Sequence, residues 1–389
     1  MAKAVLVRDK DKRVTYGHPW IFKSDIDRVE GMFTPGDVVD VYSSKSQFLG
    51  RGYINPKSQI SIRMLTNEHE DINYDFIYKR ILSAWDYRQR TADPRSCRVV
   101  YAESDFLPAL IVDKFGDYLV VQTLALGMDI HKAQIIDILD KIIKPAGIYE
   151  RNDVPVRELE GLEQQKGFLK GEFDTKVEMI ENGIKFIVDI ADGQKTGYFL
   201  DQKENRAAIK PFVKDAKVLD CFSHTGSFAL HAAHYGAASV LGIDISEHAV
   251  ESATANAALN GMGDICRFEA ANTFDKLREF YDTGEQFDTI VLDPPAFTKT
   301  RSAVEGAVRG YKEINLRAMK ILKSGGFLIT CSCSHHVDSD LFLDIIYDAS
   351  IDARKKIKLI EYRSQAKDHP ILLAADETQY LKCAILQVV

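Results

Sequence analysis

The stretch Asp220-Cys-Phe-Ser-His-Thr-Gly226, together with Gly242-Ile-Asp244, decides the fold predicted for the C-terminal half of this chain. Both stretches end apolar runs with strand character, and beyond about residue 175 strand and helix patterns alternate. That alternation is typical of a doubly wound parallel sheet. The predicted strands are residues 217–222, 239–245, 266–271, 287–292 and 327–332. Two last apolar runs, 357–362 and 381–389, suit a final antiparallel hairpin.

Three polar residues stand at successive strand ends, where doubly wound folds bind their ligands. The first turn contains one glycine, Gly226, and lacks the GxGxxG pattern that approaches a pyrophosphate, which disfavours a dinucleotide. S-adenosylmethionine (SAM) has no phosphate, and its ammonium group needs a carboxylate such as Asp220. Asp244 suits the ribose hydroxyls and Asn272 the adenine edge. Singly, each residue is more often a helix cap or turn former, but together they predict a SAM site.

The predicted SAM site also includes the run Gly193-Gln-Lys-Thr-Gly-Tyr-Phe-Leu-Asp-Gln202, which is rich in polar and aromatic residues for a linker. We expect this run to cover the cofactor. The alternative is a turn that docks Tyr198 and Phe199 into the core. The residues predicted to bind the cofactor are Lys195, Tyr198, Asp220, Phe222, Ser223, Thr225, Gly226, Asp244, Ile245, Asn272, Thr273 and Asp293.

A second motif, Asp293-Pro-Pro-Ala-Phe297, follows the fourth predicted strand and indicates the chemical site. Its prolines stiffen the backbone, so that a carboxylate and an aromatic ring are held beside the methyl donor. The motif resembles motif IV of nucleic-acid methyltransferases. In such a site a carboxylate can bind the Watson–Crick edge of an extruded base while Phe297 stacks on it. We also expect Lys299 to contact RNA.

Two cysteines of the run Ile329-Thr-Cys-Ser-Cys-Ser334 are expected to lie beside Asp293. Cytosine C5 is a poor nucleophile, so its methylation generally requires a thiolate that adds at C6. A helix N-terminus can lower the pKa of a nearby thiol, and Cys333 is closer than Cys331 to the next helix, which Asp338 could cap. Cys331 is expected to face the core. Cysteine is also a common buried hydrophobe, and the cysteines alone leave the two interpretations even.

The N-terminal part of the chain predicts a small β-barrel over residues 1–72. Short strands alternate there with turns such as Gly17-His-Pro-Trp20 and Thr34-Pro-Gly-Asp37. A central α+β domain is expected over residues 73–175, and the SAM-binding domain over 176–389. The elements predicted in the central domain are a helix over 74–90, a hairpin of strands 110–112 and 118–122, a helix near 130–143 and a strand at 147–150.

Composition excludes several classes of protein. A chain of 389 residues, 46% hydrophobic and 28% charged, is longer than one ordinary core and lacks the bias of disorder. Its apolar runs are shorter than the roughly 20 residues of a membrane helix, and its N-terminus lacks a signal-peptide core. The six cysteines are dispersed without metal-type spacing. We therefore expect a soluble cytoplasmic protein with reduced thiols and no metal.

The formal net charge of −7 argues against binding nucleic acid by bulk charge. Two local clusters, residues 3–23 and 79–98, are nevertheless basic. Each cluster is equally well explained as a solvated face or as a surface that contacts phosphates. At the first cluster we expect Arg13, His18 and Trp20 to contact RNA.

The whole chain resembles the bacterial large-subunit (23S) ribosomal RNA cytosine-5 methyltransferases that carry an N-terminal PUA domain. The landmarks are Gly17-His-Pro-Trp-Ile-Phe22, Pro35-Gly-Asp37, Asp105-Phe-Leu-Pro108, Ile111-Val-Asp113, Arg157-Glu-Leu-Glu-Gly161, Lys195 to Gln202, Asp220 to Gly226, Asp293 to Phe297 and Ser332-Cys-Ser334. The resemblance implies a PUA RNA-binding domain, a small strand-helix-strand central domain and a Rossmann-like class I methyltransferase domain. It also implies ribosomal RNA as the partner.

By the same resemblance Cys333 is the nucleophile and Asp293 recognises the cytosine N3 edge, while Asp220, Asp244 and Asn272 hold SAM. The sequence departs from the pattern at two positions. Asn272 replaces an acidic residue, and Ala296 stands where the broader RNA cytosine-5 enzymes carry a second cysteine. The C5 proton must therefore leave to another base or to water.

Other functions stay open from the sequence. Asp-Pro-Pro followed by an aromatic residue also suits methylation of an exocyclic amine of adenine or guanine, which needs no cysteine. A non-catalytic RNA-binding protein that responds to SAM is less favoured because the donor site and the acceptor motif are both intact. An NAD-linked oxidoreductase lacks its glycine fingerprint. The modified nucleotide, the choice between naked RNA and an assembly intermediate, and the formation of a homodimer are not determined by the sequence.

Overall fold

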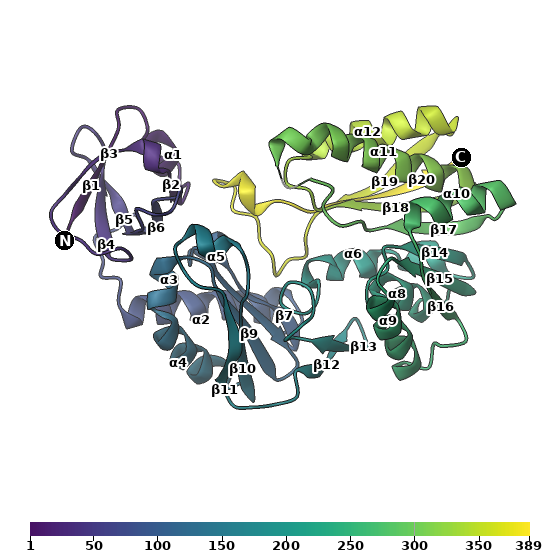
Figure 1. The fold of residues 1–389 in the computed structure, drawn as a ribbon, viewed down its shortest axis with the longest axis horizontal. Coiled ribbons are helices and arrows are strands. Elements are labelled where there is room, and N and C mark those ends of the chain that lie inside the picture. Colours follow the sequence, from purple (N-terminus) through teal and green to yellow (C-terminus); the bar gives the residue numbers. More distant parts are fainter. Residues whose placement is uncertain (299) are drawn as a thin grey trace. The chain divides into compact units, whose positions relative to one another are not determined.

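The computed structural model describes residues 1–298 and 300–389, which form two compact units. The first unit comprises Met1–Met179, Val188–Leu200 and Lys367–Thr378. The second unit comprises Ile180–Ile187, Asp201–Ala366 and Gln379–Val389. Each unit is therefore assembled from three separate stretches of the chain. In Figure 1 the sequence runs from the purple N-terminal sheet to the yellow C-terminal strands.

The first unit begins with a six-stranded sheet in the order β2-β6-β5-β4-β1-β3. Its elements are β1 (Lys3–Leu6), α1 (Lys12–Thr15), β2 (Trp20–Ile21), β3 (Ile26–Glu30), β4 (Val38–Tyr42), β5 (Phe48–Ile54) and β6 (Ile62–Thr66). β1 runs parallel to β4, and the other pairs are antiparallel. Side chains such as Leu6, Val39, Val41 and Ile62 form its buried core. The small β domain predicted here is confirmed.

A five-stranded sheet in the order β11-β10-β9-β8-β7 follows in the same unit. Its strands are β7 (Ser96–Tyr101), β8 (Leu110–Phe115), β9 (Tyr118–Thr123), β10 (Gly147–Asn152) and β11 (Gln165–Lys170). Its helices are α2 (Tyr74–Thr91), α3 (Leu126–Ile130), α4 (Lys132–Ile143) and α5 (Val156–Leu159). Ile81 of α2 and Ile135 of α4 share a buried core with Val112 and Val121 of the sheet. The predicted helices, hairpin and strand are confirmed, whereas β7 and β11 were not predicted.

Buried polar contacts join these two sheets into one unit. The Glu160 carboxylate accepts hydrogen bonds from Asn55 Nδ2 at 2.9 Å, Ser58 Oγ at 2.5 Å and Arg63 at 3.0 Å. All four side chains are buried. Because an unsatisfied buried polar group costs about 1–3 kcal/mol, this shared carboxylate fixes one sheet against the other.

The second unit is built on a seven-stranded sheet in the order β16-β15-β14-β17-β18-β20-β19. The strands are β14 (Lys217–Cys221), β15 (Ser239–Asp244), β16 (Cys266–Ala270), β17 (Phe287–Leu292), β18 (Leu322–Ser332), β19 (Ile357–Arg363) and β20 (Lys382–Val388). The first five are mutually parallel, and β20 runs antiparallel to both β18 and β19. The predicted doubly wound sheet and its terminal hairpin are confirmed.

Helices connect the strands of this sheet and cover its faces (Figure 1). They are α6 (Lys203–Ala208), α7 (Lys210–Val213), α8 (Ser227–His234), α9 (Glu247–Leu259), α10 (Thr273–Thr283), α11 (Val304–Ile321) and α12 (Ser339–Ala353). A separate hairpin of β12 (Lys176–Glu181) and β13 (Ile184–Asp189) precedes them. Across the described residues of the whole chain, every helix is too short or too polar to span a bilayer.

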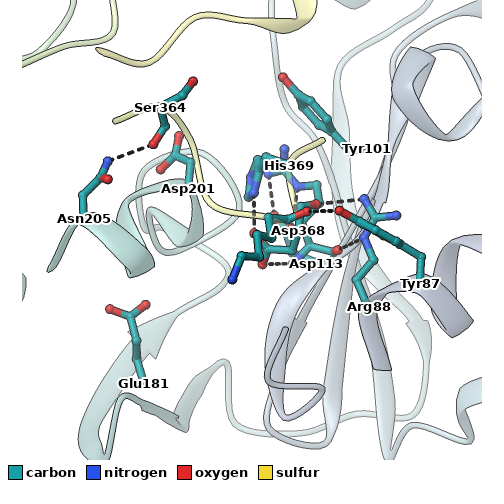
Figure 2. A network of polar contacts seen from close by, with 12 residues as sticks. Tyr87, Arg88, Tyr101, Asp113, Glu181, Asp201, Asn205, Ser364, Asp368 and His369 are labelled. Atoms are coloured by element: carbon teal, nitrogen blue, oxygen red, sulfur yellow. Dashed lines mark hydrogen bonds and ion pairs between the residues drawn. The ribbon is translucent and has the colours of Figure 1, made fainter. Parts of the chain in front are cut away.

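Between β19 and β20 the chain makes an excursion into the first unit, over Lys367–Thr378. There the fully buried Arg88 of α2 donates to the Asp368 carbonyl at 2.8 Å (Figure 2). Arg88 also donates to the Arg98 carbonyl at 2.9 Å. The Asp368 carboxylate in turn accepts from the Arg98 amide at 3.0 Å. These bonds anchor the excursion, which the sequence did not predict.

A buried ion pair should dominate the polar contribution to the stability of the second unit. Arg206 of α6 donates to both oxygens of Glu181 at 2.6 and 2.9 Å, and both side chains are buried. Arg206→Met should lower the free energy of unfolding by about 3–5 kcal/mol, because it leaves a buried carboxylate without its cation. Lys217→Met, which removes the surface pair with Glu285, should cost less than about 1 kcal/mol. Urea denaturation measures both, and equal losses would contradict the expectation.

Candidate active site

The backbone of the turn between β14 and α8 adopts a conformation that limits which residues can occupy it. Phe222, His224 and Gly226 have φ values of 63°, 48° and 81°, in the left-handed region. A Cβ at Gly226 would also lie 2.9 Å from the ring of Phe268, so two constraints favour glycine there. The turn predicted from the sequence is therefore formed, at the carboxyl end of the central strand.

Asp220 is buried at the end of β14, with one carboxylate oxygen bonded and the other not. Its Oδ2 accepts from the Ala229 amide of α8 at 2.9 Å, whereas Oδ1 has no hydrogen-bond partner among the described residues. Burial raises the pKa of the Asp220 carboxyl well above its usual range, and the carboxylates of Asp293 and Asp244 raise it further. A cation that reached Oδ1 would favour the ionised form and would be bound in return.

Two hydroxyl groups of the turn that follows Asp220 are also buried without a hydrogen-bond partner. Ser223 Oγ and Thr225 Oγ1 are buried and make no hydrogen bond with the described part of the chain. Buried polar atoms are normally satisfied, so such a group at one strand end indicates a polar ligand. SAM offers an ammonium group to a carboxylate and further polar atoms to hydroxyls, and these residues fit it.

Asp244 ends β15, the neighbouring strand. Its Oδ2 accepts from the His224 amide at 2.8 Å and its Oδ1 from the Ser246 amide at 3.0 Å. Each carboxylate oxygen can accept a second bond, so a ribose hydroxyl can still be held. The next side chain, Ile245, is 75% exposed and presents an apolar surface suited to an adenine ring.

Asn272 serves as the N-cap of α10. Its side-chain oxygen accepts from the Phe274 amide at 2.9 Å, which is the helix-cap alternative weighed from the sequence. The side chain is exposed and its amide nitrogen is a donor, while the adjacent Thr273 is buried. The cap role is established, and a contact with adenine stays a prediction for both residues.

The predicted cover of the cofactor begins in the first unit and ends in the second. Lys195 and Tyr198 belong to the first unit, where the Lys195 ammonium lies 4.5 Å from the centre of the Phe199 ring and Tyr198 is buried. Their contact with SAM stays a prediction.

Gln202, at the end of that run, belongs to the second unit and was missed as a site residue. Its Nε2 donates to Asp293 Oδ1 at 2.8 Å, and its own oxygen accepts from Asn205 at 2.7 Å. It therefore orients the carboxylate of the Asp-Pro-Pro motif. Its place at the end of a polar, aromatic run was the available signal.

Cys333 and Cys331 occupy different surroundings near the end of β18. Cys331 is fully buried opposite Cys383 of β20, and burial raises the pKa of the Cys331 thiol well above its usual range. Cys333 is half-buried, and its Sγ lies 3.9 Å from the Pro294 carbonyl of the Asp-Pro-Pro motif. Asp338 caps α12 through the Leu341 amide at 2.9 Å, as predicted. The structure thus brings Cys333 to the motif.

Lys382 of β20 is a buried ammonium beside this thiol. Its Nζ donates to the carbonyls of Ser334 at 2.7 Å and Tyr380 at 2.9 Å. Burial lowers the pKa of Lys382 to about 8, while the side chains of Cys333 and Asp338 act in the opposite direction. Within the described chain no carboxylate pairs directly with it. Sequence reasoning missed Lys382, although a lysine opening an apolar strand was a signal.

The Phe297 ring is half-buried among other rings. Its centre lies 4.6 Å from that of Tyr311, 6.2 Å from that of Phe274 and 6.5 Å from that of Phe222. Packing fixes the ring, and its stacking on a base stays a prediction. Lys299, which we expected to contact RNA, lies outside the described residues.

The three predicted RNA contacts of the first unit make internal contacts. His18 is buried, and its Nε2 lies 2.6 Å from Arg13 and 3.2 Å from Glu377. Trp20 donates its indole N–H to Glu103 at 2.9 Å. Arg13 is about half exposed and remains the most accessible of the three, and contact with RNA stays a prediction for each.

Comparison with protein families matches two parts of the chain. Residues 5–67 match a PUA-like domain, and residues 162–375 match the S-adenosylmethionine-dependent methyltransferase family. The second match covers more than half of the chain and includes the whole cluster of strand-end residues. SAM is thereby established as the cofactor of the chain, and its contact with Asp220 stays a prediction.

Similar proteins match over the whole length. The ribosomal RNA large subunit methyltransferase I of Vibrio vulnificus is 42% identical over 389 residues, which cover 98% of each chain. That of Alteromonas mediterranea is 40% identical over 392 residues, covering 100% of this chain and 99% of the other. A solved structure of a candidate SAM-dependent methyltransferase from Streptococcus mutans superposes with a TM-score of 0.83 over both full chains at 19% identity, which shows the shared fold.

Asp220→Asn should weaken SAM binding about 10- to 100-fold, because the amide keeps the bond from the Ala229 amide but loses the charge that holds an ammonium group. Asp282→Asn, an exposed position on α10, is the matched control and should bind as the native protein does. Isothermal titration calorimetry measures both affinities. Equal affinity of the two variants would remove Asp220 from the site.

Lys382→Met should slow the alkylation of Cys333 by iodoacetamide about 10-fold at pH 7, because the thiolate loses a nearby cation. Lys382→Arg keeps the charge and serves as the control. Since the ammonium form is lost as the pH rises through about 8, the difference between native protein and Lys382→Met should shrink above that pH. Mass spectrometry of the Cys333 peptide follows the reaction, and identical rates at pH 7 would contradict the expectation.

Proposed function

Because the chain belongs to the SAM-dependent family of the ribosomal RNA large subunit methyltransferases I, we propose that it methylates C5 of a cytosine in large-subunit ribosomal RNA with Cys333 as the nucleophile. The observation that carries the cytosine assignment is the contact of the half-buried Cys333 thiol with Pro294 of the Asp-Pro-Pro motif. An amine methyltransferase would need the carboxylate but not the thiol.

SAM supplies an electrophilic methyl group when bound. Asp220 would hold its ammonium group, Asp244 its ribose and Ile245 its adenine, and the buried hydroxyls of Ser223 and Thr225 would find hydrogen-bond partners on it. In this arrangement the residues at the ends of β14 and β15 would orient the cofactor. The carboxyl end of β17 then brings the acceptor base next to it.

Asp293 holds the Watson–Crick edge of the target cytosine. Gln202 donates to one oxygen of this carboxylate, which limits the rotation of the side chain. The direction of the other oxygen, which binds the base, is thereby fixed. The two prolines after Asp293 limit the backbone in the same way. A cytosine held at this edge presents its C5–C6 bond to neighbouring groups of the site.

The Cys333 thiolate adds to C6 of that ring and makes C5 nucleophilic. C5 then bonds to the methyl group as the bond between that group and the sulfonium sulfur of the donor breaks. The proton on C5 leaves, and the bond between Cys333 Sγ and C6 breaks to restore the aromatic ring. The Lys382 ammonium favours the thiolate before addition and after release. Because Ala296 stands in place of a second cysteine, the proton leaves to water or to another base.

The PUA-like domain supplies the grip on RNA that the acidic net charge does not. A small β domain with basic residues around α1 can bind folded RNA through phosphates and shape, and base choice is left to the catalytic pocket. The substrate is accordingly ribosomal RNA, met either naked or in an assembly intermediate.

A covalent trap tests the proposed chemistry. Substrate RNA that carries 5-fluorocytosine should form a stable adduct with the native protein, because fluorine at C5 cannot leave as the proton does. The adduct should be visible as a slower band on denaturing gels and should map to Cys333 by mass spectrometry. Methylation of ordinary RNA without any adduct would favour the amine methyltransferase.

Alanine variants of the two cysteines provide the matched pair. Cys333→Ala should abolish transfer of labelled methyl to RNA while SAM binding, measured by calorimetry, stays unchanged. Cys331→Ala should retain most of the activity, because Cys331 faces the sheet core. Loss of activity confined to Cys331→Ala would move the nucleophile to that residue.

A further inference from the structure

The first unit contains a cavity that no step of the methylation reaction uses. It measures about 190 Å³ and is lined by the turn between α1 and β2, the end of β6, Arg80 of α2, the loop 102–109 and Leu372. Pockets for drug-sized ligands are typically about 300–1,000 Å³, so this cavity suits one planar ring system and not a whole cofactor.

The loop 102–109 has a backbone shape that is enforced by its surroundings. Ala102, Phe106 and Ala109 have φ values of 39°, 57° and 65°, which residues other than glycine rarely adopt. The Asp105 carboxylate holds the loop, accepting from the buried Arg88 and from the Tyr101 amide at 2.5 Å each. Backbone strain that the surrounding structure maintains clusters at functional sites.

This loop presents an aromatic ring at the cavity. Phe106 is 50% exposed although its ring is apolar. The Arg80 guanidinium lies 5.1 Å from the centre of the Phe106 ring and 5.0 Å from that of Phe76, and it donates to the Leu65 carbonyl at 3.3 Å. A ring and a guanidinium at the rim of a small cavity form a surface on which a nucleobase can stack.

A carboxylate lines the same cavity. Glu103 is about nine-tenths buried, and its Oε1 accepts from the Trp20 indole at 2.9 Å and lies 3.6 Å from Arg63. Its Oε2 makes no hydrogen bond with the described residues. This oxygen can accept a hydrogen bond from a ligand in the cavity, and its charge repels a phosphate.

We propose that this cavity binds one unpaired base of the RNA, which stacks on Phe106 and donates an exocyclic amino group to Glu103. The inference rests on the proposed RNA substrate and adds a second point of base recognition, outside the methylation site. The ligand class is a base with an exocyclic amino group, which is cytosine, adenine or guanine, in preference to uracil, which has none. A cationic side chain of a protein partner is disfavoured in this cavity because the positive charge of Arg80 would repel it.

Binding of short RNA to the full-length protein tests the stacking surface. Phe106→Ala should weaken the binding of fluorescein-labelled hexacytidylate about 10-fold, because stacking on an aromatic side chain contributes about that factor or more per base. Phe168→Ala is the matched control, since Phe168 of β11 is also an exposed ring of the first unit but lies outside the cavity. Fluorescence anisotropy measures the affinities.

Glu103→Gln tests the base preference. The amide oxygen can still accept from Trp20, but the side chain now offers a donor to the cavity. The ratio of affinities for hexacytidylate and hexauridylate should fall by about 5-fold or more, because uracil accepts where cytosine donates. Affinities of both variants equal to those of the native protein would overturn the base site. Loss of binding to a ribosomal protein, with RNA binding unchanged, would assign the cavity to a protein and overturn it as well.

These outcomes are separate from those of the methylation reaction. The cavity variants should retain the 5-fluorocytosine adduct at saturating RNA. A protein that forms no adduct but shows the Phe106 and Glu103 effects would refute the cytosine chemistry alone. A protein that forms the adduct without those effects would refute the base site alone.

Discussion

Parallel pairing of β14 with β15 and β17, and of β17 with β18, is the constraint on which the site depends. In this register Asp220 lies opposite Gly242 and Val291, and Leu292 lies opposite Thr330. Parallel strands point their carboxyl ends to one edge, so residues far apart in sequence converge there without any contact of their own. The buried apolar strands thus fix the positions of the polar side chains. Hydrogen bonds such as that from Gln202 to Asp293 then set the orientation of these side chains.

Asp220 and Cys333 could be predicted from the sequence because each directly follows or ends an apolar strand, and strands carry a strong local pattern. The same pattern gave the bounds of β14 to β17 to within one residue. Gln202 and Lys382 reach the site differently, from a segment before the sheet and from an antiparallel return strand. No local periodicity encodes such pairings, and only the register of β20 against β18 shows that Lys382 lies opposite Ser332.

Side chains of the same type differ in their roles here because their surroundings differ. Cys331 lies on β18 and Cys333 directly follows the end of that strand, yet one thiol faces another buried thiol and the other contacts a carbonyl of the Asp-Pro-Pro motif near the Lys382 ammonium. Buried carboxylates differ in the same way: Glu181 is fully paired with Arg206, whereas Asp220 keeps one oxygen unsatisfied. The paired groups stabilise the folded chain, and the unsatisfied ones lower its stability unless a ligand completes them.

The excursion over Lys367–Thr378 bears on how such a protein can change in evolution. Recombination usually exchanges domains as single uninterrupted pieces of a gene. Here the last strand of the seven-stranded sheet is encoded after a segment that belongs to the first unit, so no single cut separates the two units. The two units are therefore hard to separate by truncation or by exchange of domains, and the PUA-like domain and the methyltransferase domain are inherited together.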